Sequence, residues 1–219
     1  MANPVIIVAG AGRGLGEAIG RRFGRGGYDV ALLARTEQTL TELGTALQAE
    51  GITAGWTTVD MTDDDAFRAA IERFAGHAGR IDALHFNPSA FTEKSPLELS
   101  PDELLRDVHL GVASLLTAVQ AARPFMSDGG RITATGSRAA DHPWAGAASL
   151  GVQKAALRNL VSAIDITLAP DGIRAASITV NGTIEVGGRF DPDLIADAVF
   201  TVAQTPTDSW QRVVRYDGR

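Results

Sequence analysis

Four alternating glycines near the start of the chain carry its clearest chemical signal. They follow the apolar run Val5–Ala9 directly. Glycine permits a positive φ in a tight turn and lets a phosphate approach the backbone closely. The dipole and free N–H groups of a following helix attract an anion. We therefore predict a dinucleotide site here, the alternative being a glycine-rich turn without a ligand. The expected loop residues are Gly10, Gly12, Arg13, Gly14, Leu15 and Gly16.

Arg35 indicates which dinucleotide is bound. It follows the apolar run Asp29–Ala34, where an NAD site would need Asp or Glu to accept the ribose hydroxyl hydrogen bonds. A guanidinium instead suits a 2′-phosphate, which it can meet with two parallel hydrogen bonds. Arg13 could reach the same phosphate, although either arginine could also be a solvated surface charge. The two arginines, with no acid at this position, predict NADP.

Asp60 and Met61 follow a third apolar run and are candidates for adenine binding. Asp60 could accept a hydrogen bond from the adenine amino group, with Met61 packed nearby. The alternative is that Asp60 caps a helix expected to begin near Asp63.

Short apolar runs alternate with longer amphipathic segments along the whole chain. This alternation is typical of βαβ units and a parallel sheet. We predict one Rossmann-like domain over residues 1–219: an α/β, doubly wound, seven-stranded, mainly parallel sheet with helices on both faces. The expected strands are Val5–Ala9, Asp29–Ala34, Thr53–Asp60, Ile81–Asn87, Arg131–Thr135, Arg174–Val180 and Gln211–Tyr216. The expected helices are Leu15–Gly26, Gln38–Glu50, Asp63–His77, Pro101–Met126, Ala145–Leu168 and Pro192–Gln204.

The composition excludes several classes of site. The chain has 219 residues, a formal net charge of −6 and no cysteine. The acidic balance argues against nucleic-acid binding, and the lack of cysteine excludes disulfides and thiolate metal sites. No run reaches membrane-spanning length, and no signal peptide is apparent. We expect a cytoplasmic protein without a metal site or a membrane partner.

Taken together, these motifs resemble the short-chain dehydrogenase/reductase family along essentially the whole chain. Ala9–Gly16 is similar to its Thr-Gly-x-x-x-Gly-x-Gly loop, and Asp60-Met61 to its adenine-binding pair. The resemblance implies an NAD(P)-dependent enzyme that moves hydride between the cofactor and a carbonyl or alcohol. Three further segments of this chain are similar to the family's sequence pattern: Ile81–Leu84 leading to Asn87, Gly130–Ile132 before Ser137, and Lys154–Leu157.

The resemblance also implies a catalytic relay, of which this sequence keeps only part. Ser137 matches the serine that orients the carbonyl, and Lys154 matches the lysine that holds the ribose. The tyrosine that donates the proton is replaced by Leu150, and the helix asparagine by His109. Two loops also differ from the family's pattern. Where the family has Asn-Asn-Ala-Gly, this chain has Phe86-Asn87-Pro88-Ser89, and where the family has Pro-Gly, it has Asn181-Gly182.

Leucine cannot donate a proton, so any reduction needs another acid. The candidates are a water held by Ser137, His109 acting through a water, and His142 on the loop after Ser137. Each has a plain structural alternative, with Ser137 as a turn or cap residue, His109 as a locally bonded helix residue and His142 as a surface residue.

The sequence thus predicts an atypical NADP-dependent oxidoreductase acting on a small carbonyl or imine. The alternative is a catalytically inactive NADP-binding sensor or partner protein. We expect an open or small substrate pocket walled by Phe91, Trp144 and Phe190, the alternative being that these aromatics are core or interface residues. The expected helices Pro101–Met126 and Ala145–Leu168 are apolar on more than one side. An additional apolar side is typical of a helix buried against a partner, so we expect a homodimer or homotetramer.

Overall fold

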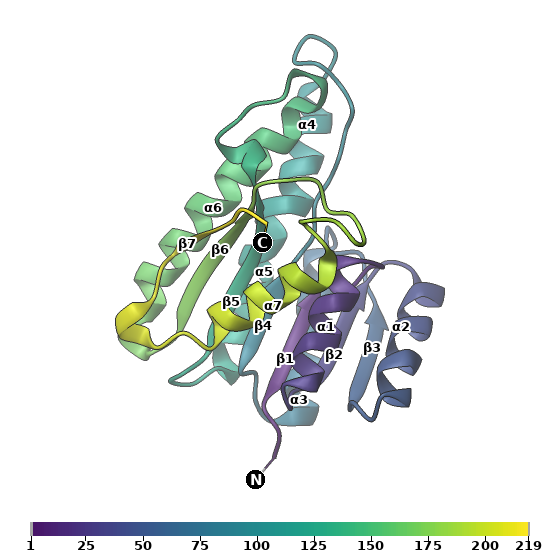
Figure 1. Ribbon diagram of the computed structural model, residues 1–219, viewed down its shortest axis with the longest axis vertical. Helices are drawn as coiled ribbons and strands as arrows, with labels where there is room; N and C mark the ends of the chain where they lie inside the picture. Colours follow the sequence, from purple (N-terminus) through teal and green to yellow (C-terminus); the bar gives the residue numbers. More distant parts are fainter. Residues whose placement is uncertain (1, 219) are drawn as a thin grey trace.

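A parallel sheet organises the fold. The computed structural model describes residues 2–218, and within them seven parallel strands lie in the order β3-β2-β1-β4-β5-β6-β7 (Figure 1). The sequential order reverses between β1 and β4, and such a switch point opens a crevice at the carboxyl ends of the strands. The strands are β1 (Val5–Ala9), β2 (Asp29–Ala34), β3 (Ala54–Thr58), β4 (Ala83–Phe86), β5 (Arg131–Ser137), β6 (Arg174–Val180) and β7 (Val213–Tyr216).

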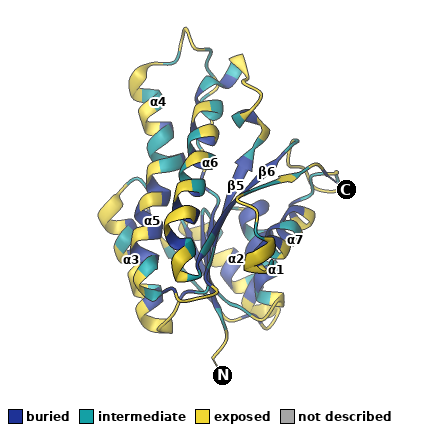
Figure 2. Ribbon diagram, turned by 90° about the vertical axis from the view of Figure 1, so that its left-hand side faces the viewer, coloured by how far each residue is buried: buried dark blue, intermediate teal, exposed yellow. Residues whose placement is uncertain are grey.

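Helices cover both faces of the sheet (Figure 2). One face carries α1 (Leu15–Arg25), α2 (Glu37–Ala49) and α7 (Pro192–Ala203), and the other carries α3 (Asp64–Ala78), α5 (Ser114–Ala122) and α6 (Ala148–Leu168). Each face has its own apolar cluster, with Phe23 and Leu32 in the first and Phe67 and Leu157 in the second. The predicted seven-stranded sheet with helices on both faces is therefore confirmed.

The inner strands β1 and β4 are buried along their whole length because both of their faces are covered, and His85 is the one polar residue in them. All five residues of β1 are buried, as are all four of β4. Continuous apolar runs of this kind are typical of parallel sheets between two helix layers. The edge strands β3 and β7 are only partly buried and are shorter than the sequence predicted.

The helix expected over Pro101–Met126 is interrupted. Helix α4 (Pro101–Val108) passes into a π-helical segment, His109–Ala113, before α5 begins. Two features accompany the wider turn. The Ser114 hydroxyl donates to the Leu110 carbonyl at 2.7 Å, and a Cβ at Gly111 would lie 2.3 Å from Gln153 Oε1. A hydroxyl bonded four residues back and a glycine under a neighbouring helix both favour local distortion.

Two further observations concern the described residues alone. In residues 2–218 no helix is long and apolar enough to cross a bilayer. The cytoplasmic location expected from the sequence stays a prediction. The same part of the chain holds no group of three or more His, Asp or Glu side chains placed to bind a metal ion.

Candidate functional site

Two adjoining cavities lie beyond the carboxyl ends of the strands. The first, of about 350 Å³, is lined mainly by residues that follow β1, β2, β3 and β4. The second, of about 480 Å³, is lined by residues at or after the carboxyl ends of β1, β4, β5 and β6 and by residues of α6. Asn87 and Ser89 line both, so the two cavities form one cleft. This is the crevice in which doubly wound sheets bind their ligands.

The glycine loop forms one wall of the cleft. Gly10 has a φ of 84°, and a Cβ there would lie 2.9 Å from the Pro88 nitrogen. A Cβ at Gly16 would lie 2.6 Å from the Gly10 carbonyl oxygen, so these two glycines are required by close packing. By contrast, nothing lies within 4 Å of a Cβ placed at Gly12 or Gly14. These two positions open into the cleft, as a backbone cradle for a pyrophosphate requires.

Helix α1 starts directly behind this loop with its N-terminus available to an anion. Gly14 is the N-cap residue, and no side chain within the described residues caps the first turn. Leu15 lines the second cavity, whereas Gly16 is buried against the loop. The backbone N–H groups at a helix start and the helix dipole favour a phosphate at this point.

The two predicted phosphate-binding arginines are placed differently. Arg35 lies in the lining of the first cavity, between Ala34 and Thr36. Arg13 instead lines the second cavity and forms an exposed ion pair with Glu42 of α2. Among the described residues that line the first cavity none carries a carboxylate. Arg35 is thus the one charged side chain in the described lining of this cavity, and, together with hydrogen bonds from Thr62, its charge lowers the pKa of the neighbouring Asp60.

Met61 and Asp60 are also separated by the structure. Met61 lines the first cavity, but Asp60 does not. The Asp60 carboxylate accepts hydrogen bonds from the Thr62 backbone at 2.9 Å and the Thr62 hydroxyl at 2.8 Å, and these bonds lower its pKa. Asp63, not Asp60, caps α3, accepting from the Ala66 backbone at 3.0 Å. Asp60 thus stabilises a turn beside the cavity, and its contact with adenine stays a prediction.

Ser137, Leu150 and Lys154 all line the second cavity. Lys154 is 3% exposed, and its Nζ donates to the Thr135 carbonyl oxygen at 2.9 Å. Burial lowers the pKa of Lys154 to about 8, because the charged form loses hydration. Ser137 Oγ accepts from the Ala139 backbone at 3.2 Å, which leaves the hydroxyl hydrogen for another partner. On α6, Leu150 lies four residues, or about one helical turn, before the buried ammonium group of Lys154.

The histidines and aromatics proposed from the sequence lie elsewhere. His109 Nε2 is 3.5 Å from Asp64 Oδ2, and His142 is exposed on the loop after β5. Neither lines either cavity.

The expected aromatic walls are also absent from the described lining of the second cavity. Phe91 and Trp144 stack on one another, with ring centroids 5.8 Å apart, and both are more than half exposed. Phe190 packs against Tyr216. The apolar wall is aliphatic instead and consists of Leu15, Leu150, Val180, Ile184, Val186 and Pro192.

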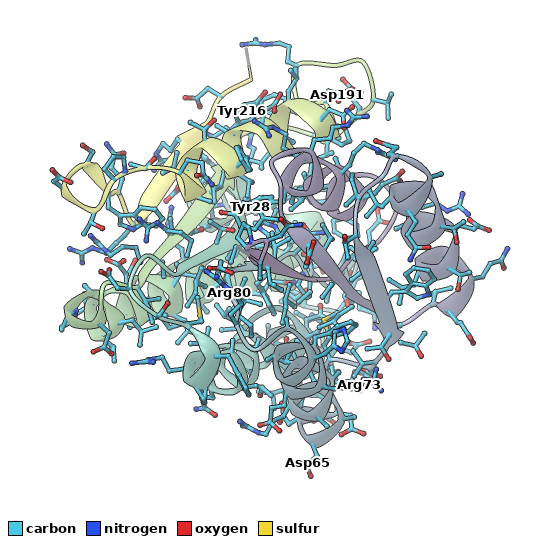
Figure 3. The ribbon with its side chains drawn as sticks, turned by 90° about the horizontal axis from the view of Figure 1, so that it is seen from below. Tyr28, Asp65, Arg73, Arg80, Asp191 and Tyr216 are labelled. Carbon is cyan, nitrogen blue, oxygen red and sulfur yellow. The ribbon has the colours of Figure 1, made fainter. Side chains whose placement is uncertain are left out.

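No tyrosine of the chain takes part in the cleft. The chain contains two, Tyr28 and Tyr216, both labelled in Figure 3. Tyr28 packs on Phe23 and Phe200, and the Tyr216 hydroxyl donates to the Arg189 carbonyl at 3.3 Å. Neither of them lines a cavity of the cleft described above.

Two residues that the sequence reasoning missed shape the cleft. Thr135 lines the second cavity, and its carbonyl holds Lys154. Gln153 is fully buried, and its amide bonds to both the carbonyl and the N–H of Ala90, at 2.8 Å and 3.1 Å. A polar residue beside Lys154 on a buried helix face is the signal that could have indicated Gln153.

Comparison with known proteins decides the family. The family described as short chain dehydrogenase matches residues 4–186. The chain belongs to this family. Its members are oxidoreductases that use a nicotinamide dinucleotide. The match ends before α7 and β7, which lie beyond residue 186.

Individual relatives are distant in sequence but similar in structure. The meso-2,3-butanediol dehydrogenase of Serratia marcescens is 29% identical over 177 residues, covering 80% of this chain and 70% of that protein. A solved short-chain dehydrogenase/reductase from Serratia marcescens has a TM-score of 0.89 at 28% identity, covering 99% of this chain and 97% of that one. A metagenomic short-chain oxidoreductase solved in complex with NADP has a TM-score of 0.88 at 25% identity, covering 100% and 99%.

Proposed function

We propose that this protein is an atypical NADP-dependent oxidoreductase that transfers hydride between NADPH and a small carbonyl or imine. The observation that carries the proposal is the shared cleft. The open glycine positions, Arg35 and Lys154 line two cavities that meet at Asn87 and Ser89. A dinucleotide needs such an arrangement, with one site for each nucleotide half and a phosphate cradle between them.

Arg35 is the residue proposed to select NADP. It lines the first cavity, where the family places the adenosine half of the cofactor, and the described lining of that cavity offers no carboxylate to repel a 2′-phosphate. A guanidinium binds phosphate with charge-assisted, bidentate hydrogen bonds. The metagenomic relative solved with NADP supports the same choice. Arg13 can assist only by leaving its exposed partner Glu42, a pair that contributes little.

Lys154 and Ser137 are proposed to position the reactants. One N–H of Lys154 is used by Thr135, which leaves two to hold ribose hydroxyls. The Ser137 hydroxyl hydrogen is free to orient a substrate oxygen. When bound, the nicotinamide supplies the hydride, and the rate then depends on how closely donor and acceptor are held.

The proton must come from a group other than the side chain at position 150. Leu150 takes the position of the family's tyrosine, one helical turn before Lys154, and has no proton to give. A water held by Ser137 and the Lys154 ammonium are the donors that we propose in its place. Losing one general acid costs typically a factor of about 10² to 10⁴ in rate, which slows a reductase without abolishing it.

Leu150 also supports a second candidate function, a catalytically inactive NADP-binding sensor or partner protein. The cofactor cleft is retained in this reading, and the reaction is lost. The two candidates differ in one measurable property, NADPH oxidation by the pure protein with a broad panel of carbonyls and imines. Activity that disappears in Lys154→Ala supports the oxidoreductase, and complete inactivity with intact NADPH binding supports the sensor.

The cofactor assignment is tested by calorimetric titration of wild-type protein and Arg35→Asp with NADPH and NADH. A charge-assisted hydrogen bond contributes about 1.5–3 kcal/mol, so NADPH affinity should fall at least tenfold while NADH affinity changes little. Arg73→Asp makes the same charge change on α3, outside the cleft, and is the matched control. Equal losses for the two cofactors would overturn the assignment to NADP.

We also propose a homodimer or homotetramer formed through α4, α5 and α6. Leu105, Leu116, Val152 and Ile166 lie on these helices and are between 44% and 65% exposed. Figure 2 shows exposed stretches along all three helices, on the side away from the sheet. Apolar side chains gathered on one outer layer are typical of a surface covered by a partner.

A further inference from the structure

A fully buried histidine lies directly behind the cleft and has no part in the function proposed so far. His85 is the third of the four residues of β4, which pairs with β1, and it is 0% exposed. Its Nδ1 lies 2.8 Å from Thr133 Oγ1, and its Nε2 lies 3.1 Å from Thr135 Oγ1. Both threonines belong to β5, where His85 pairs in register with Thr133. An imidazole held at both nitrogens has a fixed orientation.

The hydrogen bonds continue from His85 to the glycine loop. Thr135 Oγ1 lies 2.8 Å from Asn87 Oδ1, and Asn87 Nδ2 lies 3.0 Å from the Gly10 carbonyl oxygen. Thr135 also connects to the other half of the cleft, because its carbonyl accepts the bond from Lys154. One buried threonine thus links the glycine loop to the lysine.

The Gly10 carbonyl determines the direction of every bond in this series. A carbonyl oxygen only accepts, so the Asn87 amide must present its NH₂ group to it and its Oδ1 to Thr135. Oδ1 also only accepts, so the Thr135 hydroxyl must donate to it. The Thr135 oxygen is then left to accept, and the donor is the N–H at Nε2 of His85. Nδ1 carries no proton and accepts from Thr133.

We infer that His85 is a positioning residue for the cofactor site: as the Nε2–H tautomer it orients Thr135, and through Thr135 it fixes Asn87 and the glycine loop. This inference rests on the proposed function, since the cleft it prepares is that of the nucleotide. Asn87 lines both cavities, so its amide orientation affects the point at which the two halves of the cofactor meet. Burial lowers the pKa of His85 to about 3, which keeps the ring neutral at physiological pH.

Two substitutions that differ by one methylene separate the two ring nitrogens. The amide of His85→Gln reaches the place of Nε2 and can still donate to Thr135. The shorter amide of His85→Asn reaches the place of Nδ1, contacts Thr133 and leaves Thr135 without its donor. We expect His85→Gln to keep NADPH affinity within about threefold and His85→Asn to lose about tenfold, the equivalent of one hydrogen bond. Thr133→Val removes only the outer bond and should behave like His85→Gln.

The affinities are to be measured by NADPH titration below the unfolding midpoint of each variant, with folding checked by circular dichroism. A purely structural role for His85 would lower the unfolding midpoints and leave the NADPH affinities of folded protein alike. That result would overturn the inference while the proposed function stands. Wild-type protein that binds neither NADPH nor NADH would overturn both.

Nitrogen-15 NMR of the wild-type histidines gives a test that needs neither a variant nor a ligand. The chain has four histidines, of which His85 is the buried one among the described residues. We expect its ring to carry a proton on Nε2 and none on Nδ1 at neutral pH. A proton on Nδ1 would reverse the bond directions and exclude the proposed control of Asn87.

Discussion

The pairing of a buried lysine with a leucine determines the chemistry of the second cavity at the scale of single residues. Lys154 loses most of its hydration, which lowers its pKa to about 8, and one of its hydrogens is held by Thr135. In the family, a phenol one helical turn earlier uses this ammonium to lower its own pKa. Leu150 provides the cavity with apolar surface instead, and the Lys154 charge adds to the effect of burial in lowering the pKa of His85.

Restoring the phenol should therefore restore a proton donor. Leu150→Tyr places a hydroxyl beside Lys154, where the positive charge favours phenolate and brings its pKa toward neutrality. We expect NADPH-dependent reduction to rise by about 10² or more, the usual contribution of a general acid. The rate is measured with the best carbonyl of a broad panel, and the phenol is titrated by its ultraviolet absorbance.

Leu150→Phe is the control for this substitution because it fills a similar volume without the hydroxyl. A tyrosine variant no faster than the phenylalanine variant would show that position 150 cannot supply a proton in this fold.

The loops after β1 and β4 hold one another at the scale of elements. Gly10 lies against Pro88, and Asn87 bonds to the Gly10 carbonyl. The loop after β4 is in turn fixed to α6 by the two bonds between Gln153 and Ala90. A strand, a helix and two loops thus share one connected set of contacts, so the glycine loop does not take its shape from its own sequence alone.

Two glycines of the loop should respond oppositely to a methyl group. Gly16→Ala brings a Cβ to 2.6 Å from the Gly10 carbonyl, so the loop must shift. Overpacking costs about 1–3 kcal/mol, which exceeds the helix-propensity gain of about 1 kcal/mol. We expect a lower free energy of unfolding, measured by urea denaturation.

Gly12→Ala is its counterpart, because nothing lies within 4 Å of the added Cβ. Its stability should stay within about 0.5 kcal/mol of wild type, whereas NADPH affinity should fall because the methyl group enters the first cavity. A Gly12→Ala protein with unchanged affinity would contradict the placement of the cofactor along the loop.

At the scale of the whole molecule, the outer surface of the α4–α5–α6 layer is where we expect a second copy of the chain to bind. Val152 and Ile166 lie fourteen residues apart on α6, which places them on the same helix face, and both are exposed. We expect light scattering at micromolar concentration to give twice or four times the 23.0 kDa mass of the chain. The double variant Val152→Glu/Ile166→Glu should shift the mass toward that of the monomer.

Val186→Glu is the matched control for the assembly, since Val186 is 88% exposed but lies on the loop after β6. It should leave the mass unchanged. Wild-type protein that scatters as a monomer would refute the proposed oligomer.

Local signals were sufficient to predict the sheet and the glycine loop. Apolar runs of strand length and the glycines that follow β1 lie close together in the sequence, and the periodicity between them predicted the helices on both faces. The π-helical segment was not predicted, because it depends on Gln153 packing over Gly111 from another helix. The series from His85 to Gly10 was missed for the same reason, since it depends on how β4 and β5 align.

The residues of the candidate site also divide into those that the local sequence predicts and those that depend on contacts between distant segments. Arg35 and Met61 line the first cavity because they lie in the loops at the carboxyl ends of β2 and β3, a position that the sequence reveals. Asp60 follows the same rule but turns back onto Thr62. Phe91 and Trp144 were assigned to the pocket by residue type alone, and their stacking on one another depends on two loops whose paths the sequence does not specify.

The long-range support of the glycine loop has a consequence for the order in which the protein matures during synthesis. The ribosome releases the loop early, but Asn87, which holds Gly10, lies 77 residues further on, and Thr135 lies another 48 beyond it. Chains fold from the N-terminus as they are made, so the first βαβ unit can form while the loop still lacks its support. On the proposed function, we therefore expect the nucleotide site to be complete only after β5 has emerged and paired with β4.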